Sequence, residues 1–311
     1  MALAEFSLIK RFFTQQQVKN TSTKLGIGDD CAVLSIPQGY ELVVTTDTMV
    51  ENVHFFAGAE PRALGHKLLA VNLSDLASMG AQPISVTLAL TLPSIDERWL
   101  EQFSNGFLAL AALHSVDLIG GDTTSGPLTL TVQAMGLVPK DQALLRSKAQ
   151  AGDFIYMTGF LGDAGLGLKI KQGYSSKHSQ IPLHRFNKPD PQISTGIALL
   201  GVANACIDIS DGLAADLGHI LDESQVGALL DWENLPLSVA VFDYIKETGD
   251  WRMPLMAGDD YELCFTVKPE KVALLPLNCT KIGVIESSPG LRLKKSGSIQ
   301  PIESKGYEHF S

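Results

Sequence analysis

The stretch Asn72-Leu73-Ser74-Asp75-Leu76-Ala77 is echoed later in the chain by Asp208-Ile209-Ser210-Asp211-Gly212-Leu213-Ala214. Both stretches place an aspartate directly after a serine and beside apolar residues. A short repeat of this kind is typical of a chain built from two related halves. We therefore predict a mixed α/β (α+β) protein in which each half presents carboxylates to a common cleft.

The length and composition of the chain also favour two domains. It has 311 residues, of which 45% are hydrophobic, and this is too long for one ordinary core. Residues 139–151 are polar and rich in turn-forming residues. We place the domain boundary there, with an N-terminal domain at residues 1–146 and a C-terminal domain at residues 147–311.

The charge balance narrows the classes of partner. The net charge is −10 and the pI is near 5.1, which disfavours nucleic acid and anionic membranes. A nucleotide substrate stays possible, because bound metal would neutralise both carboxylates and phosphates. No apolar run approaches the ~18 residues of a membrane span, and residues 1–10 lack the pattern of a signal peptide. We expect a cytoplasmic protein.

The four cysteines show no metal-binding spacing. Cys31, Cys206 and Cys264 lie in apolar runs, and we expect them to be small core residues. The sequence therefore favours neither a zinc site nor a disulfide framework.

Apolar periodicity, with glycine and proline as breaks, predicts the regular elements. Residues 120–126 are predicted to be a glycine-rich loop, and residues 172–191 a polar excursion. The predicted helices are 5–13, 61–79, 95–113, 162–171, 193–204 and 213–221, and the predicted strands are 32–36, 41–46, 85–92, 116–119, 128–135, 153–158, 263–267 and 281–285.

A set of aspartates carries the functional signal, because each stands in a short polar break beside apolar or small residues. Two such charges ~4 Å apart would repel by roughly 4 kcal/mol at an effective dielectric of about 20, so converging carboxylates need a cation. Ligand sets made only of oxygen atoms suit Mg²⁺ or Ca²⁺, and Mg²⁺ usually combines a few carboxylates with substrate phosphates. The set is Asp30, Asp47, Asp75, Asp122, Asp208 and Asp211.

Three of these positions, taken singly, have an ordinary structural alternative. Asp47 could cap a turn, Asp75 could be a solvated helix position, and Asp122 could belong to a hairpin turn. The two glycines before Asp122 would let a phosphate approach backbone N–H groups. The hypothesis of a magnesium-dependent, phosphate-handling enzyme therefore rests on the whole set.

Familiar nucleotide and hydrolase motifs are absent from the sequence. There is no P-loop, no dinucleotide fingerprint, no EF-hand, no GxSxG and no HExxH. Arg146 could hold a nucleotide phosphate or could be a surface arginine near a linker. His54 could be structural, and the acidic residues 258–262 could form a solvated loop.

A series of short motifs runs in order along nearly the whole chain: Gly28-Asp-Asp-Cys-Ala, Thr45-Thr-Asp, Val53-His-Phe, Asn72-Leu-Ser-Asp-Leu-Ala-Ser-Met-Gly-Ala, Gly120-Gly-Asp-Thr, Asp208-Ile-Ser-Asp-Gly-Leu, Gly258-Asp-Asp-Tyr-Glu-Leu and Gly306-Tyr-Glu-His-Phe. Together these motifs resemble those of the thiamine-monophosphate kinase family. The superfamily also contains aminoimidazole ribonucleotide synthetase, selenophosphate synthetase and a hydrogenase-maturation protein. The His54 segment and the C-terminal tail favour the kinase within it.

The resemblance implies a two-domain subunit whose N-terminal β-sheet pairs with that of a second copy into a dimeric barrel, followed by a C-terminal α/β domain. It also implies roles for individual residues. The metal-binding positions are Asp30, Thr45, Thr46, Asp47, Asp75, Asp122, Asp208 and Asp211. The ATP-binding positions are Gly121, Asp122, Arg146 and Ser210, and the substrate positions are His54, Asp259 and Tyr307. The family often has glutamate where Asp259 stands.

The reaction implied is the transfer of the γ-phosphoryl group of ATP to thiamine phosphate, giving thiamine diphosphate. The substrate phosphate would attack in line, with several Mg²⁺ ions, and no nucleophilic side chain would be needed. Two alternatives remain open. One is another ATP-dependent enzyme of the superfamily, and the other is a non-catalytic protein whose acidic loops bind metal or nucleotide.

Overall fold

The computed structural model describes residues 5–15, 20–304 and 306, with side chains from residue 7 onward, and divides the chain into two compact units. Unit 1 contains Met1–Leu76 and Ala81–Asp141, and unit 2 contains Ala77–Gly80 and Gln142–Ser311. Across the described residues, no helix is both long and apolar enough to cross a membrane.

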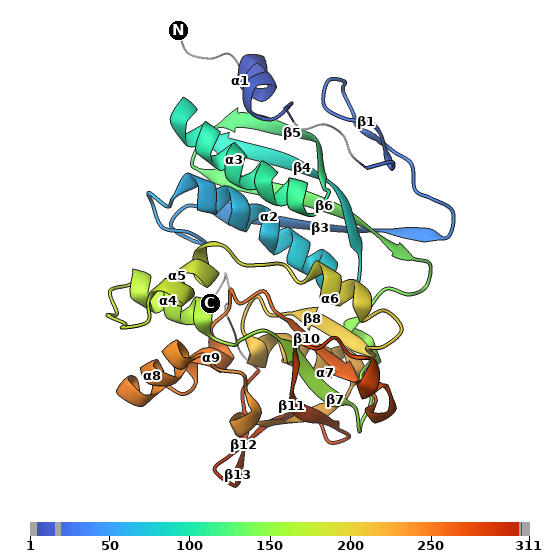
Figure 1. Ribbon diagram of the computed structural model, residues 1–311, viewed down its shortest axis with the longest axis vertical. Helices are drawn as coiled ribbons and strands as arrows, with labels where there is room; N and C mark the ends of the chain where they lie inside the picture. Colours follow the sequence, from blue (N-terminus) through green and yellow to red (C-terminus); the bar gives the residue numbers. More distant parts are fainter. Residues whose placement is uncertain (1–4, 16–19, 305, 307–311) are drawn as a thin grey trace. The chain divides into compact units, whose positions relative to one another are not determined.

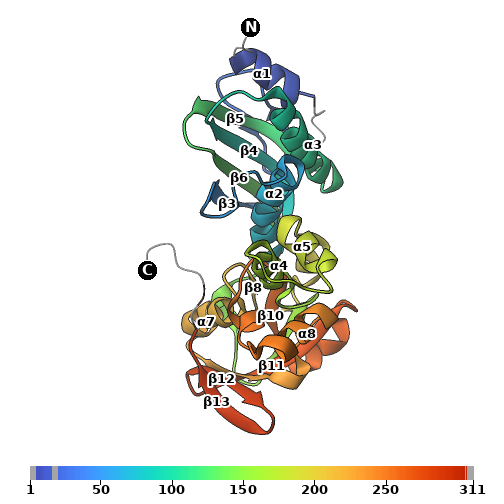
Figure 2. The same cartoon turned by 90° about the vertical axis from the view of Figure 1, so that its left-hand side faces the viewer.

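Unit 1 consists of a four-stranded sheet in the order β3-β6-β4-β5, with helices α2 and α3 on one of its faces (Figures 1 and 2). Strand β6 is antiparallel to β3 and β4, whereas β5 is parallel to β4. A small β1–β2 sheet completes the unit. The elements are α1 Glu5–Phe12, β1 Thr23–Leu25, β2 Val33–Leu34, β3 Tyr40–Val50, α2 Pro61–Ser78, β4 Gln82–Leu92, α3 Glu97–Leu113, β5 Asp117–Ser125 and β6 Thr129–Pro139.

Two glycines allow α2 and α3 to approach backbone to backbone. A Cβ at Gly65 would lie 2.2 Å from the carbonyl oxygen of Phe103, and one at Gly106 would lie 1.9 Å from that of Arg62. Side chains of any size at these positions would force the helices apart. The close crossing fixes α2, which carries Asp75, over the sheet.

Unit 2 is built on a seven-stranded sheet in the order β13-β12-β9-β11-β7-β10-β8. All neighbouring strands are antiparallel except β12 and β9. Helix α7 packs against β8 and β12, while α4 packs against α5, α8 and α9. The elements are β7 Phe154–Thr158, α4 Asp163–Lys171, α5 Gln180–Asn187, α6 Ile193–Ala198, β8 Ala205–Asp208, α7 Leu213–Ser224, β9 Gly227–Asp231, α8 Val239–Thr248, α9 Met253–Met256, β10 Leu263–Val267, β11 Cys279–Glu286, β12 Gly290–Lys295 and β13 Ser298–Ile302, with short 3-10 helices at Arg146–Lys148, Trp232–Asn234 and Pro269–Leu274.

Most predicted helices are confirmed, and the main errors concern loops. The predicted loop at 120–126 is wrong, because β5 continues to Ser125 by pairing with β4. The polar excursion at 172–191 contains α5, and the helix expected at 193–204 ends at Ala198. The predicted strand at 32–36 is only β2, which pairs with β1. The two strand differences arise because each strand forms by pairing with another strand, which a local sequence pattern does not reveal.

The cysteine prediction is correct for two positions and wrong for one. Cys206 and Cys264 are buried, whereas Cys31 is exposed. Cys31 lies in the turn that follows Gly28-Asp29-Asp30, so its apolar neighbours in the sequence do not draw it into a core. All four cysteines are free thiols.

Candidate functional site

Three of the predicted metal positions come together where β3 crosses beneath α2. The hydroxyl of Thr45 donates to a carboxylate oxygen of Asp75 at 2.5 Å. The backbone N–H of Asp47 donates to the side-chain oxygen of Asn72 at 3.2 Å. Thr45 and Asp47 are two residues apart on β3 and therefore share the face covered by helices, while Asn72 and Asp75 share one side of α2. Thr45, Asp47 and Asp75 form a half-buried polar group, which we call the β3–α2 site.

Thr46 and Asp122 belong to the opposite, open face of the same sheet. Side chains alternate along a strand, so Thr46 points away from its neighbours Thr45 and Asp47. Cross-strand pairing places Asp122 in one row with Thr48, on the same face as Thr46, and both predicted residues are exposed. Asp122 is on edge strand β5, three strand spacings or about 14 Å from β3. Unit 1 alone therefore does not assemble the predicted metal residues into one cluster.

Gly121 is required by the packing of β5 against β4. A Cβ on this residue would lie 1.9 Å from the carbonyl oxygen of Leu88, whereas one on Gly120 would meet nothing closer than 3.9 Å. The glycine lets the strand that carries Asp122 lie close to its neighbour. Packing alone therefore requires glycine at this position, and the absence of a side chain would also leave room for a phosphate.

Asp30 and His54 lie in the irregular segments of unit 1. Asp30 is exposed, and its N–H donates to the carboxylate of Asp29 at 2.9 Å. The N–H of Val50 donates to Nδ1 of His54 at 3.0 Å. Because Nδ1 accepts, the neutral imidazole carries its proton on Nε2, which can act as a donor.

In unit 2, a single buried carboxylate organises the turn that follows β8. One oxygen of Asp216 accepts from the backbone N–H groups of Ser210, Asp211 and Gly212, at 3.0, 3.0 and 3.1 Å. Burial raises the pKa of Asp216 to about 7, and the nearby charge of Asp211 adds to this effect. These N–H groups are engaged, so a ligand would be met by the side chains of Ser210, Asp211 and the buried Asp208.

The acidic turn at residues 258–262 lies alongside the segment that follows β8. The N–H of Asp259 donates to the carbonyl of Ser210 at 2.9 Å, and the N–H of Tyr261 donates to that of Ile209 at 2.8 Å. A Cβ on Gly258 would lie 2.0 Å from the Ser210 carbonyl oxygen. The pairing continues the β8–β10 ladder, so Ser210, a predicted ATP-binding residue, and Asp259, a predicted substrate-binding residue, share one framework.

The interpretation of residues 258–262 as a solvated loop is wrong, because Asp260 and Glu262 are each only 2% exposed. Asp260 accepts from the N–H groups of Gly162 and Ala164 at 2.7 and 3.2 Å, and burial raises its pKa to about 8. Glu262 forms an ion pair with Arg185 and accepts from Thr158 at 2.5 Å; burial raises its pKa as well. These contacts attach the turn to α4, α5 and β7.

Arg146 and Ser210 lie at opposite ends of β8. The residue before Arg146 bridges to Ala205 at the start of the strand, and the carbonyl of Arg146 accepts from Ser224 at 2.7 Å. The two ends of a four-residue strand are about 10 Å apart. Arg146 is exposed, and the structure does not bring these two predicted ATP-binding residues side by side. Tyr307 lies outside the described residues.

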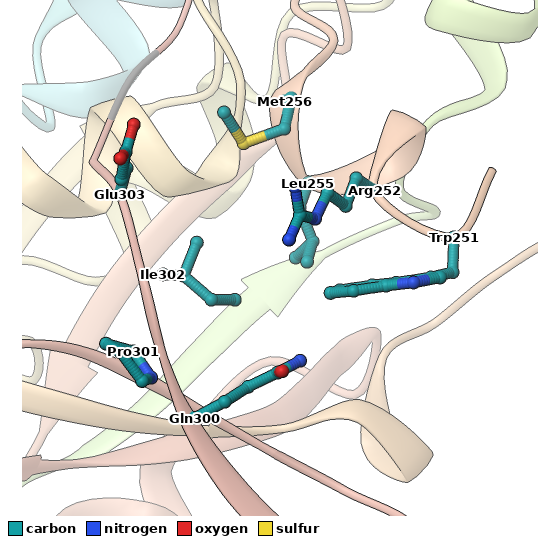
Figure 3. Close-up of a pocket in the computed structure, with 8 residues that line it drawn as sticks. All are labelled: Trp251, Arg252, Leu255, Met256, Gln300, Pro301, Ile302 and Glu303. Atoms are coloured by element: carbon teal, nitrogen blue, oxygen red, sulfur yellow. The ribbon is translucent and has the colours of Figure 1, made fainter.

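A surface cavity of about 390 Å³ opens in unit 2, between residues 251–256 and 300–303. Figure 3 shows Trp251, Arg252 and Met256 on one side of it and Gln300 and Ile302 on the other. Its lining includes none of the predicted site residues. The lining residue Met256 nevertheless lies close to the turn that carries Asp211, because a Cβ on Gly212 would lie 2.8 Å from the carbonyl oxygen of Met256.

The oxygen donors described above suit Mg²⁺ that is bound together with phosphates, rather than a cation held by protein side chains alone. Among the described residues, no three His, Cys, Asp or Glu side chains group closely enough to hold a metal ion. Mg²⁺ characteristically uses one or two carboxylates and completes its shell with phosphate oxygens and water. The Asp75–Thr45 pair and the Asp208–Asp211 segment each offer the oxygen donors that such an arrangement requires.

The predicted site residues did not include Asn72, Asp216, Asp260 or Tyr261, which take part in the contacts described above. Asn72 and Asp216 lie in predicted helices, and the signal available in the sequence was a polar residue among apolar ones. The second half of the internal echo also differs in structure from the first. Asp75 lies within α2, whereas Asp211 lies in the turn before α7.

Comparison with known proteins is consistent with this architecture. The models for the AIR synthase related protein N-terminal and C-terminal domains match residues 28–138 and 150–295. The thiamine-monophosphate kinase of Haemophilus influenzae is 46% identical, over 100% of this chain and 99% of its own. The crystal structure of thiamine-monophosphate kinase from Stenotrophomonas maltophilia K279a is 41% identical with a TM-score of 0.85, covering 96% of this chain and 99% of its own. The structure of AaThiL complexed with AMPPCP and TMP is 28% identical with a TM-score of 0.81, and the match covers 100% of this chain and 99% of that one.

Proposed function

The chain belongs to the thiamine-monophosphate kinase family, and we propose from this premise how its residues divide the work of the reaction. The protein is an ATP-dependent kinase that phosphorylates thiamine phosphate to thiamine diphosphate. The two alternatives left open by the sequence, another enzyme of the superfamily and a non-catalytic binding protein, are therefore set aside.

The phosphate of thiamine phosphate attacks the γ-phosphorus of ATP directly and in line. A phosphate oxygen is already ionised at neutral pH, so no side chain has to act as a covalent nucleophile. Catalysis then depends on positioning the two phosphates and neutralising their charge. The supporting observation is the backbone pairing of residues 209–210 with residues 259–261, because it holds Ser210, which we propose contacts ATP, beside Asp259, which we propose contacts thiamine phosphate.

The carboxylates would hold Mg²⁺, which supplies the positive charge that neutralises the triphosphate. The residues that would hold it are Asp30, Thr45, Thr46, Asp47, Asp75, Asp122, Asp208 and Asp211. Gly121, Asp122, Arg146 and Ser210 would contact ATP, and His54, Asp259 and Tyr307 would contact thiamine phosphate. The donor Nε2–H of His54 suits a phosphate, and the carboxylate of Asp259 suits the amine or the cationic ring.

Substrate selectivity is tested by measuring ADP release with thiamine phosphate and with unphosphorylated thiamine. We expect release only with thiamine phosphate, because only it carries the attacking phosphate. Equal release with thiamine would overturn the assigned acceptor.

The stereochemical course of the reaction tests direct transfer. ATP made chiral at the γ-phosphorus should give product with inverted configuration, whereas retention would indicate a phosphoenzyme.

The metal assignment is tested with Asp75→Asn and Asp122→Asn, and the control is Asp222→Asn, an exposed position on α7. Both site variants should fold and lose most activity, since each removes one charge that binds Mg²⁺. Normal turnover at low Mg²⁺ in either variant would remove that aspartate from the ligand set.

We propose that the protein forms a homodimer through the apolar residues of β3 on the open face of the unit 1 sheet, which leaves Asp122 on the far edge strand free for its proposed role. Tyr40, Leu42 and Val44 follow one another along this face of β3 and are 47%, 41% and 50% exposed. An edge strand with a row of exposed apolar side chains favours association with a second copy. Association of two copies through these residues would form the dimeric barrel expected from the sequence.

Sedimentation velocity tests the homodimer. Val44→Asp should shift the protein toward monomer because it buries a charge at the interface, whereas Val239→Asp, at a 68% exposed position on α8, should not. A monomeric wild type would refute this interface. The cytoplasmic location expected from the sequence stays a prediction.

A further inference from the structure

The turn that carries Asp259 has an unusual backbone. Asp259 and Tyr261 have φ angles of 68° and 50°, so two residues other than glycine adopt the left-handed conformation on either side of Asp260. Tyrosine rarely adopts this conformation, because its Cβ crowds the backbone. Such conformations persist only where the surrounding contacts over-determine them, and they concentrate at functional sites.

Contacts from three directions hold this turn. The N–H groups of Asp259 and Tyr261 donate to the carbonyls of Ser210 and Ile209, as described above. The buried carboxylate of Asp260 accepts from two N–H groups at the start of α4. Arg185 donates to the carbonyl of Asp260 at 3.3 Å and pairs with Glu262. The backbone on both sides of Asp260 is therefore fixed before any ligand arrives.

The fixed backbone brings the side chain of Tyr261 onto that of Asp259. The phenolic hydroxyl donates to Oδ1 of Asp259 at 3.0 Å, and both residues are half-buried. The terminal torsion of an aspartate is broad, so an unrestrained carboxylate turns freely about it. A charged acceptor makes a stronger hydrogen bond than a neutral one, and this bond restricts the rotation.

We infer that Tyr261 is a positioning residue for substrate binding, whose hydroxyl holds the Asp259 carboxylate in the orientation that receives thiamine phosphate. The inference rests on the proposed role of Asp259. An ionised carboxylate can accept about four hydrogen bonds, so the bond from Tyr261 is compatible with a further bond from a substrate amine. The turn thus positions the hydroxyl of Tyr261, which orients Asp259, and Asp259 itself contacts the substrate.

The test compares Michaelis constants of the full-length protein for its two substrates. Tyr261→Phe removes only the hydroxyl and should raise the KM for thiamine phosphate about tenfold, the lower range for a hydrogen bond to a charged group. The KM for ATP and kcat should stay within about twofold, because the turn and Ser210 remain in place. The matched control is Tyr244→Phe, which removes a hydroxyl that donates to Asp250 at 2.9 Å elsewhere in unit 2 and should leave both constants unchanged.

Asp259→Asn separates this inference from the role of Asp259 itself. If Asp259→Asn leaves the KM for thiamine phosphate unchanged, the proposed role of Asp259 fails, and the inference fails with it. If Asp259→Asn raises this KM but Tyr261→Phe does not, the role of Asp259 stands and the positioning inference is wrong.

The double variant gives the final check. With Asp259 already changed, Tyr261→Phe should add little further effect, because it acts through that carboxylate. Effects that multiply independently, or an equal rise in the KM for ATP, would show that Tyr261 acts by another route and would overturn the inference.

Discussion

Asp216→Ala is expected to be the most damaging single change in the turn between β8 and α7. The substitution removes the acceptor of three backbone N–H groups, those of Ser210, Asp211 and Gly212. The N–H of Gly212 is buried, so leaving it unsatisfied costs about 2 kcal/mol, while water can reach the two half-buried residues and lowers their cost to about 0.5–1 kcal/mol each. We expect a loss of about 3 kcal/mol in the free energy of unfolding.

Asp216→Asn provides the comparison that isolates the acceptor. The amide keeps a carbonyl oxygen in the same place, and the pKa of Asp216 near 7 already makes the neutral form accessible. We therefore expect a loss below about 1 kcal/mol. Asp222→Ala, an exposed aspartate on the same helix, controls for the loss of charge.

Urea unfolding followed by tryptophan fluorescence measures these differences. Two of the three tryptophans, Trp232 and Trp251, lie in unit 2, so a Trp99→Phe background reports on that unit alone. Amide hydrogen exchange at residues 210–212 gives the local measurement and should accelerate in Asp216→Ala only. Unchanged exchange there, or a stability loss within about 1 kcal/mol of zero, would refute the acceptor role.

Three further predictions concern other parts of the molecule. Gly121→Ala should destabilise unit 1 by about 1–3 kcal/mol through its clash with Leu88 and reduce activity, whereas Gly120→Ala should be tolerated; equal urea midpoints for the two variants would contradict this packing argument. Because the native pKa of Asp260 is about 8 and the ordinary value is about 4, the unfolded state binds fewer protons than the native state between these values, and stability falls as the pH rises through this window. Asp260→Asn should flatten this part of a pH–Tm curve, and an unchanged slope would show that Asp260 ionises normally. Chelation of divalent cations should abolish turnover and leave the far-UV circular dichroism unchanged, since no preformed metal cage is present among the described residues; a loss of helix on chelation would instead indicate a structural metal.

The sequence by itself determined the family, the mixed fold class and the position of α2. The apolar spacing from Leu64 to Leu76, with Pro61 at the start and Gly80 at the stop, is local information, and α2 runs from Pro61 to Ser78. The carboxylates were recognisable because each interrupts apolar residues. These signals need no knowledge of which segments meet.

Only the tertiary structure decided which of these residues share a face. Adjacent residues on a strand point to opposite faces, so Thr45 and Asp47 join Asp75 while Thr46 does not. The extension of β5 through Asp122 required β4 as a partner, and the burial of Asp260 required α4. Such contacts join residues far apart in sequence, and their energies depend on desolvation and on partners that no local pattern specifies.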